Sequence, residues 1–278
     1  MRHHQGAAAL GALLLSVSLL APGAPGAAAP AGDSAELDAM VAAIASQLRQ
    51  SWKADPATAK LPWPAVEVLP AGQTPLSICP GATTTAFVAT GAQTPTVYCA
   101  ASGKVLLDRT RLVKEASRHG EWGVAYWVGT GLGMAILGQR GASLQPPAAA
   151  NLQANCLAGV LIGGTNLQPK PQDPHRPDQL IAPANGAYGT AMAEQMGTRS
   201  QRSYALLTGL GVTDLGGCSD GSMAQLAKDQ VPDPALLSEL GKGRDRAAFN
   251  TMAVMNRRCR RLPNSPCPRR LPSFTGQK

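Results

Sequence analysis

The sequence predicts an α+β protein that is predominantly helical, with a small strand region ahead of one central helix. Three observations support this fold class. Apolar residues recur at helical spacing from Leu37 to Trp52. Short segments rich in β-branched and aromatic residues follow between positions 65 and 108. No charged residue then occurs between Glu121 and Arg140, so the stretch 123–139 is expected to be buried.

The first helix and the strands are expected in that order along the chain. Asp33 or Ser34 can cap a helix that continues to about Trp52. Prolines at 56, 62 and 64 indicate turns. The expected strands are short and bounded by turn residues, and they cover residues 65–69, 84–90, 96–100 and 104–108.

The remaining elements are expected to be helical. Asp108 can cap a helix that ends near Gly120, and Pro146 and Pro147 mark another helix start. The prolines within 166–184 indicate a surface loop. Within the central run, Gly129, Gly131 and Gly133 each cost about 1 kcal/mol relative to alanine in a helix, which indicates close packing or shared ancestry. Further helices are expected at 186–197, 200–210, 222–229 and 245–258.

The N-terminus has the three parts of an export signal, which we predict to span residues 1–29. Arg2 is positive, residues 7–21 are apolar, and small residues with prolines follow at 21–30. Cleavage is expected between Ala24 and Ala31, which gives a secreted or periplasmic protein. An uncleaved anchor is the alternative, although the apolar segment is short for a membrane span of about 20 residues.

The cysteines fit an oxidising compartment, because their number is even and none is spaced C-x-x-C. The pairs close in sequence are Cys79 with Cys99 and Cys259 with Cys267. Cys156 and Cys218 are then left as the third pair by elimination. A thiolate zinc site is not expected from these spacings.

Positive charge is concentrated at the C-terminus. The formal net charge is +8, from 25 basic and 17 acidic residues. Residues 257–278 form a basic, cysteine-containing tail with no acid, which is expected to be solvated or to contact an anionic envelope polymer. Nucleic acid is not an expected partner, because the tail has only Phe274 for base stacking. The candidate contact residues in the tail are Arg257, Arg258, Arg260, Arg261, Arg269 and Arg270.

Three separated blocks resemble one known family. The blocks are "TVYCAASGKVLLD", "EWGVAYWVGTGLGMAI" and "NLQANCLAG", within residues 35–165. They are similar in order and spacing to the bacterial neutral zinc metallopeptidases, which show F-Y-C-P-x-D-x-x-x-Y-L-D-like, A-Y-V-I-A-H-E-x-G-H-H and E-L-Q-A-D-C-x-A-G segments. "DGSMAQ" at 220–225 resembles a later H-G-S-x-A-Q segment. The resemblance implies a zincin-like fold for residues 30–256.

The resemblance also implies that the family's chemistry is missing. In that family two histidines four residues apart hold zinc, and the glutamate between them acts as general base. These three positions correspond here to Thr130, Gly131 and Met134. The third ligand corresponds to Asn151, and the aspartate of the same block corresponds to Asn155. Threonine, asparagine and methionine are poor zinc ligands, so we expect no metal, no cofactor and no catalytic residue at this site.

The expected function is therefore that of an exported pseudo-metallopeptidase, which binds a peptide or protein partner in the old active-site cleft. One alternative is a hydrolase of this family with unrecognised catalytic residues. Another is an envelope-structural protein that contacts polyanions through the basic tail. A dinucleotide-binding glycine turn is excluded, since no Asp or Glu follows from Trp122 to Gln172. A membrane span at 122–138 would be barely long enough, and none is expected in the mature chain.

Overall fold

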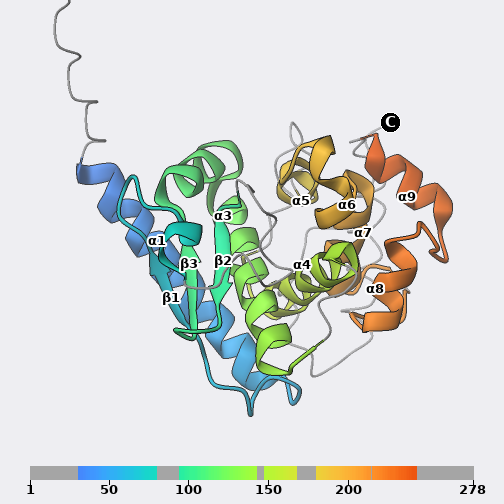
Figure 1. Ribbon diagram of the computed structural model, residues 1–278, viewed down its shortest axis with the longest axis horizontal. Coiled ribbons are helices and arrows are strands. Elements are labelled where there is room, and N and C mark those ends of the chain that lie inside the picture. Colours follow the sequence, from blue (N-terminus) through green and yellow to red (C-terminus); the bar gives the residue numbers. More distant parts are fainter. Residues whose placement is uncertain (1–30, 80–93, 143–146, 168–179, 214, 243–278) are drawn as a thin grey trace, which may run out of the picture.

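The computed structural model describes residues 31–79, 94–142, 147–167, 180–213 and 215–242. The predicted signal, the strand at 84–90, the helix at 245–258, Cys259, Cys267 and the basic tail lie outside these residues. The described part is predominantly helical with one small sheet, as predicted (Figure 1). Its helical segments are α1 (Ala31–Ala54), α2 (Pro75–Ile78), α3 (Arg109–Gln139), α4 (Pro147–Gly163), α5 (Ala182–Gly186), the 3-10 turn η2 (Thr190–Met192), α6 (Ala193–Met196), α7 (Arg199–Gly209), α8 (Asp220–Leu226) and α9 (Pro234–Gly241).

The sheet has the order β1-β3-β2, and its strands correspond to three of the predicted segments. They are β1 (Ala65–Val68), β2 (Thr96–Cys99) and β3 (Lys104–Leu107). The central strand β3 pairs in parallel with β1 and antiparallel with β2. In Figure 1 the sheet and α1 lie on one side of α3, and α4 to α9 lie on the other. The long helix α3 therefore stands between the sheet and the helical half.

The uncharged run predicted to be buried forms the second half of α3. Every residue from Trp122 to Leu137 is buried. Gly129 and Gly133 face α4: a Cβ atom at Gly129 would lie 3.3 Å from that of Ala158, and one at Gly133 would overlap the carbonyl oxygen of Ala154. Close helix packing therefore explains these glycines, as expected.

Helix α3 changes direction at Gly120, near the position where the helix capped by Asp108 was expected to end. Gly120 has φ 61° and ψ −151°, a conformation that is almost confined to glycine. The Asp108 carboxylate caps the start of α3 by accepting a hydrogen bond from the Arg111 backbone N–H at 3.0 Å, as predicted. The two halves of α3 consequently run in different directions (Figure 1).

The conformation of Gly120 leads to a testable prediction. Gly120→Ala is expected to lower the free energy of unfolding by about 1–3 kcal/mol, through backbone strain alone. Steric overlap does not contribute, because a Cβ atom there would meet nothing within 4 Å. Gly221→Ala in α8 is the matched control, since this site is equally open and has no positive φ. It should stabilise by about 0.5–1 kcal/mol. Urea denaturation measures both, and equal effects would contradict the assignment of strain to Gly120.

Several boundaries differ from the predictions. Helix α1 already begins at Ala31, so Ser34 lies inside it and does not cap it. The Ser34 hydroxyl instead accepts a hydrogen bond from Arg109 Nη1 at 2.8 Å. The single helix predicted at 186–197 is wrong: α5 ends at Gly186, and η2 and α6 follow as short separate turns. Helix α9 was not predicted, although Asp233 and Pro234 carry the usual N-terminal signal.

Two predicted disulfides are present in the described residues, and both have Cα atoms 5.5 Å apart. Cys79–Cys99 joins the end of α2 to β2, and Cys156–Cys218 joins α4 to the turn before α8. Such pairs are compatible with an oxidising compartment. None of the helices in the described ranges is long and apolar enough to cross a membrane.

Candidate functional site

The positions that the resemblance aligns with a zinc site all lie on the packed helices α3 and α4, and their polar side chains bond to their surroundings. The Thr130 hydroxyl donates to the Tyr126 carbonyl oxygen one turn earlier, at 2.8 Å. The Tyr126 hydroxyl donates to Asn155 Oδ1 on α4. Asn155 Nδ2 in turn donates to the Asn151 carbonyl oxygen at 2.7 Å. Burial raises the pKa of Tyr126, so this phenol remains neutral and acts as a donor.

The other positions of the set also have structural roles. Asn151 Nδ2 donates to the Pro147 and Gln195 carbonyl oxygens, at 3.0 and 2.9 Å, which ties α4 to α6. Met134 is fully buried in an apolar cluster with Leu137, Ala150 and Ala154. Gly131 faces the sheet, where a Cβ atom would overlap Thr96 Oγ1. The structure thus places Met134 and Asn155 where α3 meets α4, whereas Asn151 bonds toward α6 and Gly131 faces the sheet.

These residues do not fit a zinc ion. A zinc site needs imidazole, thiolate or carboxylate donors that converge on one point. Here the Thr130 hydroxyl and the Asn151 amide are engaged with backbone carbonyls, and the Met134 sulfur is packed among apolar side chains. Within the described ranges, no group of three His, Cys, Asp or Glu side chains could hold a metal ion together.

A cavity of about 800 Å³ lies beside this interface. Its described lining comes from residues 72–74, Pro95, Asp108, the first half of α3, the second-half residue Trp127 and the segment 186–189 with Met192. None of the five positions is among these lining residues. Trp127 and Tyr188 are buried, whereas Gly72, Lys114 and Gly189 are exposed, so the cavity has an aromatic floor and an open rim.

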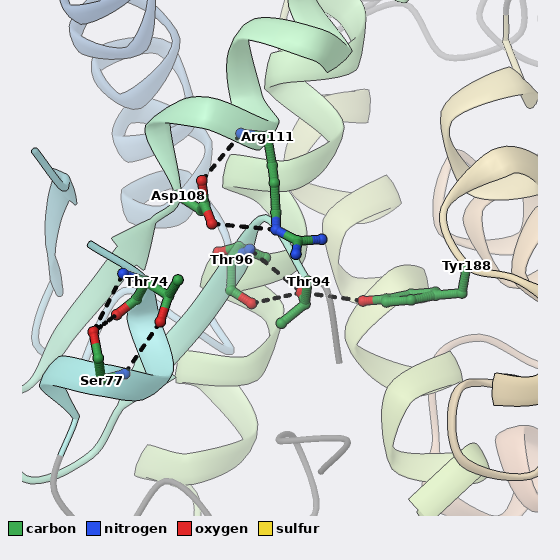
Figure 2. A network of polar contacts seen from close by, with 7 residues as sticks. All are labelled: Thr74, Ser77, Thr94, Thr96, Asp108, Arg111 and Tyr188. Carbon is green, nitrogen blue, oxygen red and sulfur yellow. Dashed lines mark hydrogen bonds and ion pairs between the residues drawn. The ribbon is translucent and has the colours of Figure 1, made fainter. Parts of the chain in front are cut away.

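Tyr188 connects the helical half of the molecule to the sheet. Its hydroxyl donates to Thr94 Oγ1 at 3.2 Å, and Thr94 Oγ1 donates to the Thr96 carbonyl oxygen at 2.8 Å. Figure 2 shows the Tyr188 ring reaching across from the helical side toward Thr94, below Arg111. The ring meets Trp127 edge to face, with centroids 5.6 Å apart. Burial raises the pKa of Tyr188 to about 12, so it is a neutral donor at physiological pH.

A buried arginine holds the wall that carries Tyr188. Arg202 on α7 is 1% exposed and donates to the carbonyl oxygens of Ala184, Asn185, Tyr188 and Gly197, at 2.6–3.4 Å. Its guanidinium also lies 5.3 Å from the centre of the Tyr188 ring. Burial lowers the pKa of Arg202. Backbone carbonyls and one aromatic face therefore compensate for the buried charge.

The charged rim of the cavity is one face of the first half of α3. Arg111 Nε lies 3.2 Å from Asp108 Oδ2, and Arg118 Nη1 lies 3.4 Å from Glu115 Oε1 (the first pair is drawn in Figure 2). Lys114 lies between these pairs, and no carboxylate of the described residues is within ion-pair distance of it. The rim therefore keeps one excess positive charge.

The sequence reasoning found only part of this region. Trp127 is in the core, as predicted, but its place at the cavity was not predicted, and neither were Lys114, Tyr188 and Arg202. The spacing of Arg111, Lys114, Glu115 and Arg118 places them on one helix face and could have indicated a charged rim.

The third block, on α4, lies against residues 218–220, at the start of the later family-like segment. On α4, Gln153 Nε2 donates to the Cys218 carbonyl oxygen at 2.9 Å and to Asp220 Oδ1 at 2.6 Å. The Cys156–Cys218 disulfide joins the same two segments. Comparison with known proteins adds no relative: no protein-family model matches this chain, and no curated protein or solved structure is significantly similar to it.

Proposed function

We propose that this chain is a noncatalytic, exported relative of the bacterial neutral zinc metallopeptidases that binds a peptide or protein partner. The proposal rests on the surroundings of the five residues that align with the family's zinc ligands, general base and conserved-block aspartate. The Thr130 hydroxyl, the Asn151 amide nitrogen and the Asn155 amide are hydrogen-bonded within the fold. Met134 is packed in an apolar cluster, and Gly131 has no room for a side chain. The interface serves to pack α3 against α4.

The order and spacing of the three sequence blocks support the relationship to this family. The contacts of Gln153 and Cys156 with residues 218–220 add support, because they join a second pair of family-like segments. Export is supported by Arg2 with its apolar segment and by the two disulfides. Partner binding belongs in the cavity beside the interface, since Thr130, Met134, Asn151 and Asn155 are themselves almost fully buried.

Metal content and peptidase activity test the loss of chemistry. We expect the purified exported protein to contain far less than one zinc per chain by plasma mass spectrometry, and to give no chelator-sensitive hydrolysis of casein. An active zinc peptidase assayed in parallel is the control, and its activity should disappear on chelation. Stoichiometric zinc that is lost together with peptidase activity would refute the proposal and favour a hydrolase with unrecognised catalytic residues.

A further inference from the structure

The cavity beside the α3–α4 interface combines an apolar floor with an excess positive charge at its rim. The Trp127 side chain is 1% exposed and lines the cavity, and its indole N–H has no acceptor among the described residues. The indole nitrogen itself is inaccessible, so the floor of the cavity is apolar and its charged groups lie at the rim.

The rim favours a negative ligand. The carboxylates of Asp108 and Glu115 are each paired with an arginine, and the Lys114 ammonium is left without an acidic partner in the described ranges. Lys114 is exposed on the same helix face as both pairs, so its charge is available at the mouth of the cavity. A ligand carboxylate beside Lys114 would form a charge-assisted hydrogen bond with it.

The dimensions and walls of the cavity suit a short segment of peptide. A volume of about 800 Å³ lies within the usual range for sites that enclose a drug-sized ligand, which is the size of a short peptide segment. Across from Lys114, the backbone at Gly186 and Gly189 is open: a Cβ atom at either position would meet nothing within 4 Å. The edge-to-face pair of Trp127 and Tyr188 supplies apolar surface for a side chain.

We propose that this cavity binds an acidic peptide. A ligand carboxylate pairs with Lys114, and an apolar side chain rests on the floor formed by Trp127 and Tyr188. This inference rests on the proposed peptide-binding function and adds the charge of the ligand. It does not depend on the basic tail, which would favour anionic ligands through a different part of the chain.

Isothermal titration calorimetry of the full chain tests the proposal. The probe is a short capped peptide that alternates glutamate and phenylalanine, and the comparison peptides carry glutamine or lysine in place of glutamate. We expect Lys114→Met to weaken binding of the acidic peptide about tenfold and to leave the glutamine peptide unchanged. Lys53→Met on α1 is the matched control, an exposed helical lysine outside the cavity, and it should have no effect.

Contact with the aromatic floor is followed separately by nuclear magnetic resonance. The Trp127 indole N–H signal, assigned with Trp127→Phe, should shift when the acidic peptide is added. Equal binding of the three peptides, or binding that Lys114→Met does not change, would overturn the proposal. So would succinate binding as tightly as the acidic peptide, because the site would then serve small acids. These outcomes leave the zinc assay unaffected, so failure of this inference is distinct from failure of the pseudoenzyme proposal.

Discussion

Gly131→Glu is expected to lower the free energy of unfolding by about 4 kcal/mol or more. This change introduces the glutamate that the zinc peptidases carry as general base at the position that the resemblance aligns with Gly131. A side chain at Gly131 would overlap Thr96 Oγ1, and 2.5 Å would separate its Cβ from Val105 Cγ1. The carboxylate would also be buried without a cation. Overpacking and an unpaired buried charge both destabilise, and their effects add here.

Gly221→Glu is the matched control for this substitution. Gly221 lies in the first turn of α8, where a Cβ atom would meet nothing within 4 Å and an acidic residue interacts favourably with the helix dipole. Its effect should remain within about 0.5 kcal/mol. Urea denaturation followed by circular dichroism compares the two variants. A stable Gly131→Glu protein would mean that space for catalytic chemistry persists between α3 and the sheet, contrary to the proposed function.

Arg202→Lys is expected to cost about 3 kcal/mol, although it keeps the charge. The guanidinium reaches four backbone carbonyl oxygens and lies against the Tyr188 ring. A lysine ammonium is a compact donor group that cannot span the same fork, so several buried carbonyls would lose their partners. Because those carbonyls belong to residues 184–197, the variant should also bind the acidic peptide more weakly.

Arg199→Lys tests whether the effect is specific to the buried site. Arg199 lies on the same helix but is exposed, so its replacement should change the unfolding free energy by less than about 0.5 kcal/mol. Thermal and urea denaturation measure both variants. If Arg202→Lys were as mild as Arg199→Lys, the carbonyl cluster would not depend on the guanidinium, and the cavity wall would need another source of rigidity.

Local patterns in the sequence predicted much of the fold. The uncharged run at 123–139 predicted a buried helix, because burial of all faces leaves no place for charge. Asp108 and Pro147 marked helix starts, since capping depends on residues within a few positions of one another. Two disulfide pairs followed from cysteine number and spacing. Strand pairing did not follow, since the parallel contact of β1 with β3 joins residues far apart in the chain.

The candidate site was harder to predict. The burial of Arg202 depends on carbonyls from three separate turns, which come together only when α5 and α6 pack against α7. Nothing in the local sequence distinguishes it from the exposed Arg199. The cavity likewise depends on Tyr188 meeting Thr94, residues that are 94 positions apart. The sequence pattern could locate the α3–α4 interface through the family resemblance, but it could not show that ligand space lies next to that interface.

Because α3 is kinked at Gly120, its two halves line the same cavity from two directions. Its solvent-facing half supplies the cations at the mouth, and its interior half supplies the indole beneath them. The angle between the two halves therefore sets how far a bound carboxylate can stand from the aromatic base. Variants at position 120 should therefore change which peptide lengths the cavity prefers, even though Gly120 does not itself line the cavity.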